Sequence, residues 1–432
     1  MSTLAEGVTA EDEQSSAVEY TAQAASPIVS GEVKMTIGDN ALSAVSLFDA
    51  IEITYAEINA LELADYVVTV RADSGDYTFS RMGSWCQPFY DSLLEAYNKA
   101  VLRSMFIRGN PELTASGDYY YSEYGNDGGG KAPICVFDNN VTALPPDLSA
   151  RRVPLCFLSG IEKGEFTLTL TLDAGERYTY SKLGYETDVF ADAVEKQTRK
   201  LREKTLAAVK EIDVSLTSAQ ASQLARLMPQ GAAASFGAIA GVAPSFAAAL
   251  ESKIAATRAA ESHTVFKELC HPANIWVGFR KNENYNINME QSDDAEADPE
   301  QSDDAAIAPE QSDDVPTDPY LLWLIAPSPD GLYAAVEFAE ANSATFVYRT
   351  GGDFNVFARQ INRALEAINF KREVIRLSDE ELQKPENSDY YMAAKRNAAL
   401  QFVRSNFAGR IIHSGADNWK RKLLEAWSDR VQ

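Results

Sequence analysis

Histidine and cysteine are scarce in this sequence, and the few that occur are not arranged for chemistry. Among 432 residues there are 3 His and 4 Cys. The sequence has no HExxH, His-x-x-His or Cys-x-x-Cys pattern, the spacings that bring two metal ligands together. We therefore predict no metal site, no cofactor and no catalytic residue.

Basic side chains are also few. The chain carries 39 Lys and Arg against 63 Asp and Glu, a formal net charge of -24. A nucleic-acid surface needs clustered Lys and Arg to neutralise phosphates, so we expect no nucleic-acid partner. Residues 1–32 contain no basic residue, and neither do three tandem decapeptides at 290–319 that read EQSDDAEADP, EQSDDAAIAP and EQSDDVPTDP. Both are predicted to be disordered, which leaves the rest of the chain only mildly acidic.

Targeting and membrane signals are missing as well. No basic region followed by an apolar one opens the chain, so we expect no secretory signal. Four widely spaced cysteines are typical of reduced thiols and indicate a cytoplasmic protein. Residues 227–250 contain no charge, but Pro229 and Pro244 disfavour a spanning helix there.

A long-period repeat is the most informative pattern that is present. Residues 77–89 read YTFSRMGSWCQPF and residues 178–190 read YTYSKLGYETDVF; a looser third copy, FVYRTGGDFNVF, covers residues 346–357. Alternation with period 2 before the first two copies is typical of strands. An amphipathic helix is predicted after each copy. The repeat thus predicts three units, each an antiparallel meander closed by one helix.

Such a unit resembles the pleckstrin-homology-like (PH-like) superfold, a bent seven-stranded barrel capped by one helix. The first copy is the most similar, through AIEITYAEI at residues 50–58 and the turn at Asp73. The resemblance implies an α+β fold with three tandem PH-like units, at residues 33–106, 133–210 and 273–372, the last with the decapeptides inserted.

The resemblance does not extend to lipid binding. Some pleckstrin-homology domains bind inositol phosphates through a basic loop between their first two strands. Residues 33–45, the corresponding region here, hold Lys34 as their only basic side chain. Inositol phosphate binding is therefore not implied.

Three connecting segments complete the expected organisation. Residues 107–132 contain the run NDGGG and are predicted to be a flexible hinge. Residues 211–272 are predicted to be an Ala-rich helical connector. Residues 373–432 are predicted to be a helical tail, opened by the capping box SDEE at 378–381.

The candidate binding residues are two arginines of the predicted second unit and a tyrosine cluster at the predicted hinge. Arg151 and Arg152 are adjacent guanidinium groups that fit an anion, and ion pairs with neighbouring carboxylates are the alternative. A tyrosine cluster fits a protein interface, and packing against a barrel is the alternative. The cluster consists of Tyr119, Tyr120, Tyr121 and Tyr124.

These patterns favour a non-catalytic interaction or scaffold protein. Its modules would bind a protein partner through sheet edges and the groove beside the helix. An acidic loop would engage a basic partner in a salt-dependent way. Two alternatives stay open: an enzyme or small-ligand binder with a site between modules, and a membrane-peripheral protein that uses residues 227–250.

Overall fold

The computed structural model describes residues 18–123, 125–281, 320–339, 344–413 and 415–428. Helices and antiparallel sheets are mixed along the chain, which confirms the α+β class. The decapeptides at 290–319 lie outside the described residues. Two units are distinguished by their contacts: unit 1 (Met1–Arg108, Leu144–Ala150, Glu380–Arg396) and unit 2 (Gly109–Ala143, Arg151–Asp379, Asn397–Gln432).

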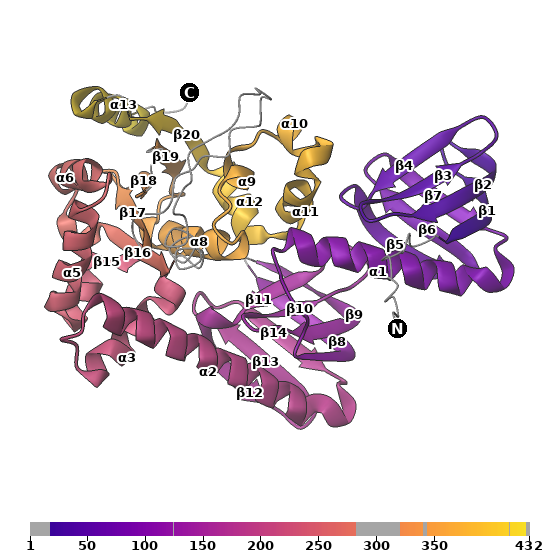
Figure 1. Ribbon diagram of the computed structural model, residues 1–432, viewed down its shortest axis with the longest axis horizontal. Coiled ribbons are helices and arrows are strands. Elements are labelled where there is room, and N and C mark those ends of the chain that lie inside the picture. The colour runs from indigo at the N-terminus through magenta and orange to yellow at the C-terminus, as the bar shows by residue number, and fades with distance from the viewer. Residues whose placement is uncertain (1–17, 124, 282–319, 340–343, 414, 429–432) are drawn as a thin grey trace, which may run out of the picture. The chain divides into compact units, whose positions relative to one another are not determined.

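Unit 1 contains a seven-stranded antiparallel sheet followed by one long helix, α1 (Figure 1). The strands lie side by side in the order β4-β3-β2-β1-β7-β6-β5. Their bounds, with those of the helix, are β1 Glu19–Ala25, β2 Ser30–Ile37, β3 Ala41–Val45, β4 Ala50–Thr54, β5 Ile58–Ala64, β6 Val67–Ala72, β7 Gly75–Ser80 and α1 Cys86–Ser104.

Strand β1 differs from the disorder expected for residues 1–32. Tyr20, Ala22 and Ala24 are buried while the residues between them face outward. Alternation of this kind lets one face of a strand join an apolar core even in an acidic segment. Residues 18–32 are therefore ordered, and residues 1–17 lie outside the described residues.

The first sheet of unit 2 repeats this arrangement. Its strand order is β11-β10-β9-β8-β14-β13-β12, and α2 follows the last strand as α1 does in unit 1. The elements are β8 Leu113–Glu123, β9 Asn126–Val136, β10 Asn140–Ala143, β11 Arg151–Pro154, β12 Leu158–Lys163, β13 Thr167–Leu172, β14 Arg177–Ser181 and α2 Thr187–Ile212.

The repeated sequence folds alike in both sheets. Gly83 and Gly184, which follow β7 and β14, have φ angles of 57° and 62°, a conformation that glycine adopts at little cost. Each glycine turns the chain from the last strand into its helix. The register also shifts at one place in the fifth strand of each sheet, between Ile58 and Ala60 in β5 and between Leu158 and Gly160 in β12.

Residues 113–123 and 126–132 lie in strands, unlike the flexible hinge expected for residues 107–132. Strands β8 and β9 pair along their whole length, with Tyr121 opposite Gly128 and Tyr119 opposite Gly130. A Cβ atom on Gly128 would lie 2.3 Å from the Tyr121 hydroxyl oxygen, so the ring covers the glycine. Cross-strand aromatic packing of this kind lets a glycine-rich segment remain in a sheet.

The second sheet of unit 2 differs from the third barrel that the repeat predicted. Its strands lie in chain order from β15 to β20. Strand β15 comes from the predicted helical connector and β20 from the predicted helical tail. The strands are β15 Ala234–Ser235, β16 Trp276–Lys281, β17 Tyr320–Pro327, β18 Tyr333–Phe338, β19 Ala344–Arg349 and β20 Phe407–Ile412.

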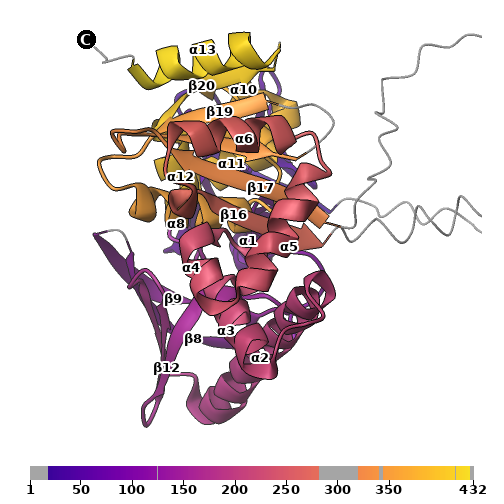
Figure 2. The ribbon, with the colours of Figure 1, turned by 90° about the vertical axis from the view of Figure 1, so that its left-hand side faces the viewer.

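Helices cover both faces of this sheet (Figure 1), and α6 lies in front of its strands in Figure 2. On one face Leu322 and Leu324 share an apolar cluster with Phe266 and Trp419. Trp323, which points to the other face, packs on Phe370. The first face meets α3 Ser218–Leu227, α4 Phe236–Val242, α5 Pro244–Ala255, α6 Ala260–Leu269 and α13 Ala416–Ser428. The second meets α8 Phe354–Ala367, α9 Glu373–Arg376 and α12 Ala398–Ser405.

The uncharged stretch at residues 227–250 forms short helices. Helix α3 ends at Leu227 and Pro244 begins α5, so the two prolines interrupt helix formation where expected. Within the described part of the chain, no helix is long and apolar enough to cross a membrane.

Candidate functional site

An extended piece of the chain lies on the outer edge of β5 in unit 1. The Leu61 backbone N–H donates to the Pro146 carbonyl at 2.8 Å, and Ala60 forms an antiparallel bridge with Asp147. We call residues 144–150 the guest segment. It occupies the position that a further strand would take beside β5.

Helix α1 holds this arrangement through two tyrosine hydroxyl groups. Tyr90 donates to the Leu61 carbonyl at 3.5 Å, and Tyr97 donates to the Asp147 carbonyl at 3.3 Å. Burial raises the pKa of Tyr97, although the neighbouring Arg396 opposes that rise. A neutral hydroxyl is therefore kept facing the guest segment at ordinary pH.

The guest segment is also shaped by its own side chains. The Ser149 N–H and hydroxyl both donate to Asp147 Oδ1, at 2.7 and 2.5 Å. Leu144 and Ala150, at its two ends, are buried. Pro146 lacks an N–H but offers its carbonyl, which is the group that the edge of β5 uses.

Helix α11 (Ser388–Arg396) packs on α1 and completes unit 1. Lys395 Nζ lies 3.0 Å from both Asp73 carboxylate oxygens. Burial alone would raise the pKa of Asp73, but hydrogen bonds from Asn59, Lys395 and Tyr391 outweigh it and lower the pKa. Arg396 donates to Tyr97 Oη at 2.6 Å and so connects α11 to the residue that holds the guest segment.

The equivalent edge in unit 2 is β12 beside α2. Ile161 pairs with Leu170 of β13 just as Leu61 pairs with Val70 of β6. Among the described residues no strand pairs with the outer edge of β12. The repeated sequences align Thr198 of α2 with Tyr97 of α1, and its hydroxyl donates within the helix instead. The outer edge of β12 thus has the register of β5, but no described strand lies beside it.

The sequence-predicted arginines are engaged in ion pairs. Arg151 Nε lies 2.6 Å from Glu123 Oε1, and Arg152 makes two contacts with Glu366, at 2.5 and 2.7 Å. The Arg152 and Glu366 side chains are 7% and 10% exposed, and such a bidentate pair is geometrically specific. The ion-pair alternative describes both arginines.

The predicted tyrosine cluster is split between the two faces of β8. Tyr119 is buried and stacks with Tyr121, their ring centroids 6.4 Å apart, while Tyr120 is 54% exposed. Arg151 lies over the Tyr121 ring at 4.1 Å. Tyr124 lies outside the described residues. Tyr119 and Tyr121 therefore pack within the sheet rather than forming a shared exposed surface with Tyr120.

A second cluster of ion pairs surrounds Arg363 of α8. Arg363 contacts Asp173 and Glu176 and lies over the Phe157 ring at 3.9 Å. Burial raises the pKa of the nearby Cys156 thiol well above its ordinary value. A thiol with a raised pKa stays protonated and is a poor nucleophile, so we interpret the cluster as structural.

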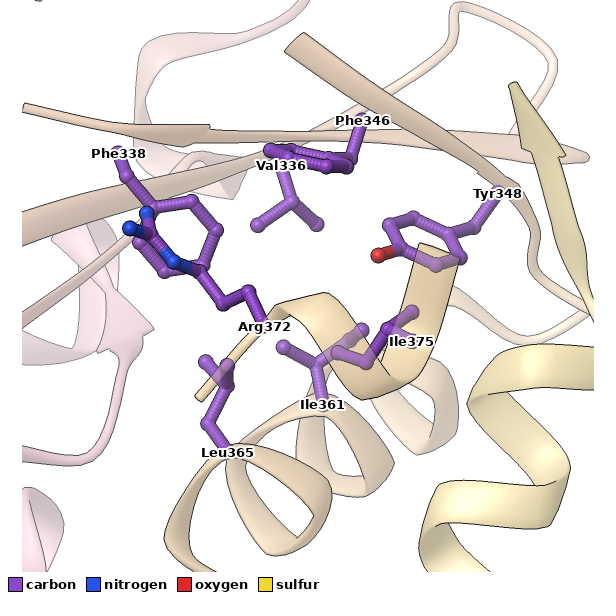
Figure 3. A pocket seen from close by; sticks show the side chains of 8 residues that line it. All are labelled: Val336, Phe338, Phe346, Tyr348, Ile361, Leu365, Arg372 and Ile375. Atoms are coloured by element: carbon purple, nitrogen blue, oxygen red, sulfur yellow. The ribbon is translucent and has the colours of Figure 1, made fainter. Parts of the chain in front are cut away.

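One small apolar pocket lies between the second sheet of unit 2 and its helices α8 and α9 (Figure 3). The Tyr348 hydroxyl points into it, and burial raises the pKa of that hydroxyl. The space in it that a water-sized sphere can occupy is about 10 Å³, roughly enough for one water molecule and too little for a ligand. The lining residues are Val336, Phe338, Phe346, Tyr348, Ile361, Leu365, Arg372 and Ile375.

A buried polar network lies on the opposite face of the same sheet. Thr345 Oγ1 donates to Glu337 at 2.6 Å and accepts from Trp419 Nε1 at 2.8 Å. His413 Nε2 lies 3.1 Å from the second Glu337 oxygen. Glu337 and Thr345 are fully buried, so the network fixes β20 and α13 on the sheet and has no access for a substrate.

Comparison with known proteins adds no family. No family model and no curated protein matches this sequence. Within the described ranges no group of three or more His, Cys, Asp or Glu is placed to hold a metal ion. At the outer edge of β5 the chain binds an extended segment of its own, the guest segment. No sequence pattern predicted this pairing.

Proposed function

We propose that unit 1 and the first sheet of unit 2 with its helix are two tandem PH-like modules. Both have the seven strands and the terminal helix that the resemblance implies, and they share one strand order and a register shift in the fifth strand. The proposal covers β1 to α1 and β8 to α2. The second sheet of unit 2, with its strands in chain order, is left out.

We further propose that the protein is a non-catalytic interaction protein. The guest segment on β5 carries this proposal, because it shows a module of this chain holding an extended segment by backbone hydrogen bonding at a sheet edge. Strand addition gives affinity through the main chain and specificity through neighbouring side chains. A protein partner, and no nucleic acid, suits the acidic chain.

A cytoplasmic location belongs to the same proposal. All four cysteines are free thiols, and Cys86 and Cys135 are buried. Proteins of reducing compartments typically keep their cysteines in this state. The acidic decapeptides at 290–319 would add a long-range attraction for a basic partner, which salt would screen.

Capture of partners by the full-length chain tests the proposed function. We expect a native extract to yield a retained protein in near-stoichiometric amount at low salt and less of it at high salt. A bait that lacks residues 290–319 should retain the same protein with a weaker salt dependence. Heat-denatured bait is the control. Retention of no protein by the folded bait would contradict an interaction function.

A further inference from the structure

We infer that the edge of β12 beside α2 is a second strand-addition site, which takes an extended segment of a partner protein. The inference rests on the proposed function and names the site and the chemistry of its occupant. The expected segment runs antiparallel to β12. It carries Lys or Arg towards its amino end and Asp or Glu towards its carboxyl end.

In the part of the chain that the structure describes, the backbone of β12 offers unpaired hydrogen-bonding groups at the same register position as β5. Leu61 directs its N–H to the guest segment and its carbonyl to Tyr90, so both groups point away from β6. Ile161 has the same register in β12, two residues beyond Ser159, where the register shifts. Its N–H and carbonyl therefore point to the outer side of the edge strand, where a guest strand can pair with them.

Helix α2 differs from α1 at the two positions whose tyrosines hold the guest segment in unit 1. The repeats align Ala191 and Thr198 of α2 with Tyr90 and Tyr97 of α1. Neither shorter side chain can reach across to a guest backbone as the tyrosine hydroxyl groups do. A partner for β12 must therefore gain its specificity from charged groups at the rim.

The rim has one acidic end. Asp188 lies 2.5 Å from Lys163, the last residue of β12. The hydrogen bond that Lys163 donates to Asp188 raises the pKa of Lys163, and the charges of Asp192 and Glu195 act in the same direction. One carboxylate thus pairs with this lysine at the carboxyl end of β12, and two further exposed carboxylates of α2 add negative charge there.

The other end of the groove is basic. Arg202 of α2 lies 3.5 Å from the Leu158 carbonyl at the start of β12. A guest antiparallel to β12 places its amino end at the three carboxylates and its carboxyl end at Arg202. Charge complementarity then fixes the direction of the occupant as well as its class.

Two capped probe peptides test this assignment on the full-length chain. The first reads Lys-Lys-Leu-Pro-Pro-Asp-Leu-Asp-Ala, which is the guest sequence with two Lys added before it and Ser149 replaced by Asp. The second exchanges every Lys for Asp and every Asp for Lys, so both have the same net charge. We expect the first peptide to bind about tenfold more tightly than the second, measured by fluorescence anisotropy.

Two variants locate the site. Ile161→Pro removes the outward N–H without touching the pairing to β13, and should weaken the first peptide about tenfold. Asp192→Lys/Glu195→Lys reverses the acidic rim and should weaken it similarly. The matched control, Glu32→Lys/Glu52→Lys, makes the same charge change at exposed positions of unit 1 and should bind like the unmodified chain.

The possible outcomes separate this inference from the proposed function. Equal binding of the first peptide to the unmodified chain and to both groove variants would overturn the site. Equal affinity for the two peptides, or no saturable binding at about 1 mM, would overturn the occupant. A partner from native extract that Ile161→Pro still retains would leave the interaction function intact while removing it from β12. If Ile161→Pro has a lower melting temperature than the unmodified chain, peptide binding by Asp192→Lys/Glu195→Lys tests the site instead.

Discussion

The first sheet of unit 2 and the second sheet of unit 2 are both antiparallel, but they bury their strands differently. In β13, which reads TLTLTL, every leucine is buried and every threonine is half-exposed. In β17, which reads YLLWLIAP, residues on both faces are buried. The first strand has a single core face closed by one helix, whereas the second lies between two layers of helices. Alternation and continuity of apolar residues distinguish the two cases.

Substitution of neighbouring residues should show this difference most strongly. Trp323→Ala and Leu324→Ala point to opposite faces of β17, and each should lower the free energy of unfolding by about 3–5 kcal/mol. In β13, Leu170→Ala should cost about 3 kcal/mol, and Thr169→Ala less than about 1 kcal/mol. Urea unfolding, together with amide hydrogen exchange of β13 and β17, measures the four changes in the free energy of unfolding. A mild Trp323→Ala would mean that one face of β17 is not a core.

Glycine replacements give the next largest contrast. A Cβ on Gly278 would lie 2.2 Å from the Trp323 ring, whereas one on Gly160 would lie 3.7 Å from the Thr171 Cβ. Gly278→Ala should therefore lower the free energy of unfolding by about 2–3 kcal/mol through overpacking, and Gly160→Ala should change it by less than about 0.5 kcal/mol. Thermal unfolding of the two variants tests this. Similar melting temperatures would contradict a fully packed second sheet.

A buried histidine makes the helical layer over the second sheet sensitive to acid. Burial lowers the pKa of His263 to about 4, and its ring stacks on Phe236. The unfolded chain takes up the proton near pH 6.5, so stability is complete above that pH and falls as the pH drops towards 4. We expect His263→Phe to remove about 2 kcal/mol of this loss. Urea midpoints at pH 7.5 and 4.5 measure it. An unchanged pH dependence in the variant would exclude His263 as the source.

Filling the small pocket should have the smallest effect, and it should be stabilising. Val336 lines the gap between the second sheet and α8 (Figure 3). Val336→Ile adds one methylene there and should raise stability by about 0.5 kcal/mol. Leu170→Ile, a shape change in the closed core of the first sheet, is the control and should be destabilising. Calorimetry resolves the sign; a loss in both variants would mean that the gap is already filled.

Local patterns predicted the local elements well. The alternation before Asp173 and the glycines at 83 and 184 located strands and turns that the structure contains. The prediction of a third barrel was wrong because its repeat covers only one strand and one helix, while β15 and β20 join the sheet from distant segments. The continuous run at residues 320–327 was the signal for a sheet covered on both faces.

The glycine run at 126–130 misled for a different reason. Glycine alone favours a hinge, and only the tyrosines of the partner strand make it a strand. The pairing of the guest segment with β5 could not be predicted from the sequence for a similar reason. The hydrogen bond from Leu61 to Pro146 joins residues that are 85 positions apart in the sequence, and no local pattern encodes it.

Unit 1 is assembled from stretches of chain that are made at very different times. Arg103 contacts Asp389, which lies 286 residues further on, and Tyr97 accepts from Arg396. On the ribosome, α11 emerges long after β1 to β7 and α1, so unit 1 is completed only when the chain has been made as far as Arg396. Chains truncated before residue 388 would leave the α11 face of α1 exposed to solvent and to aggregation. Synthesis through α11 is thus a condition for unit 1 to reach its native packing.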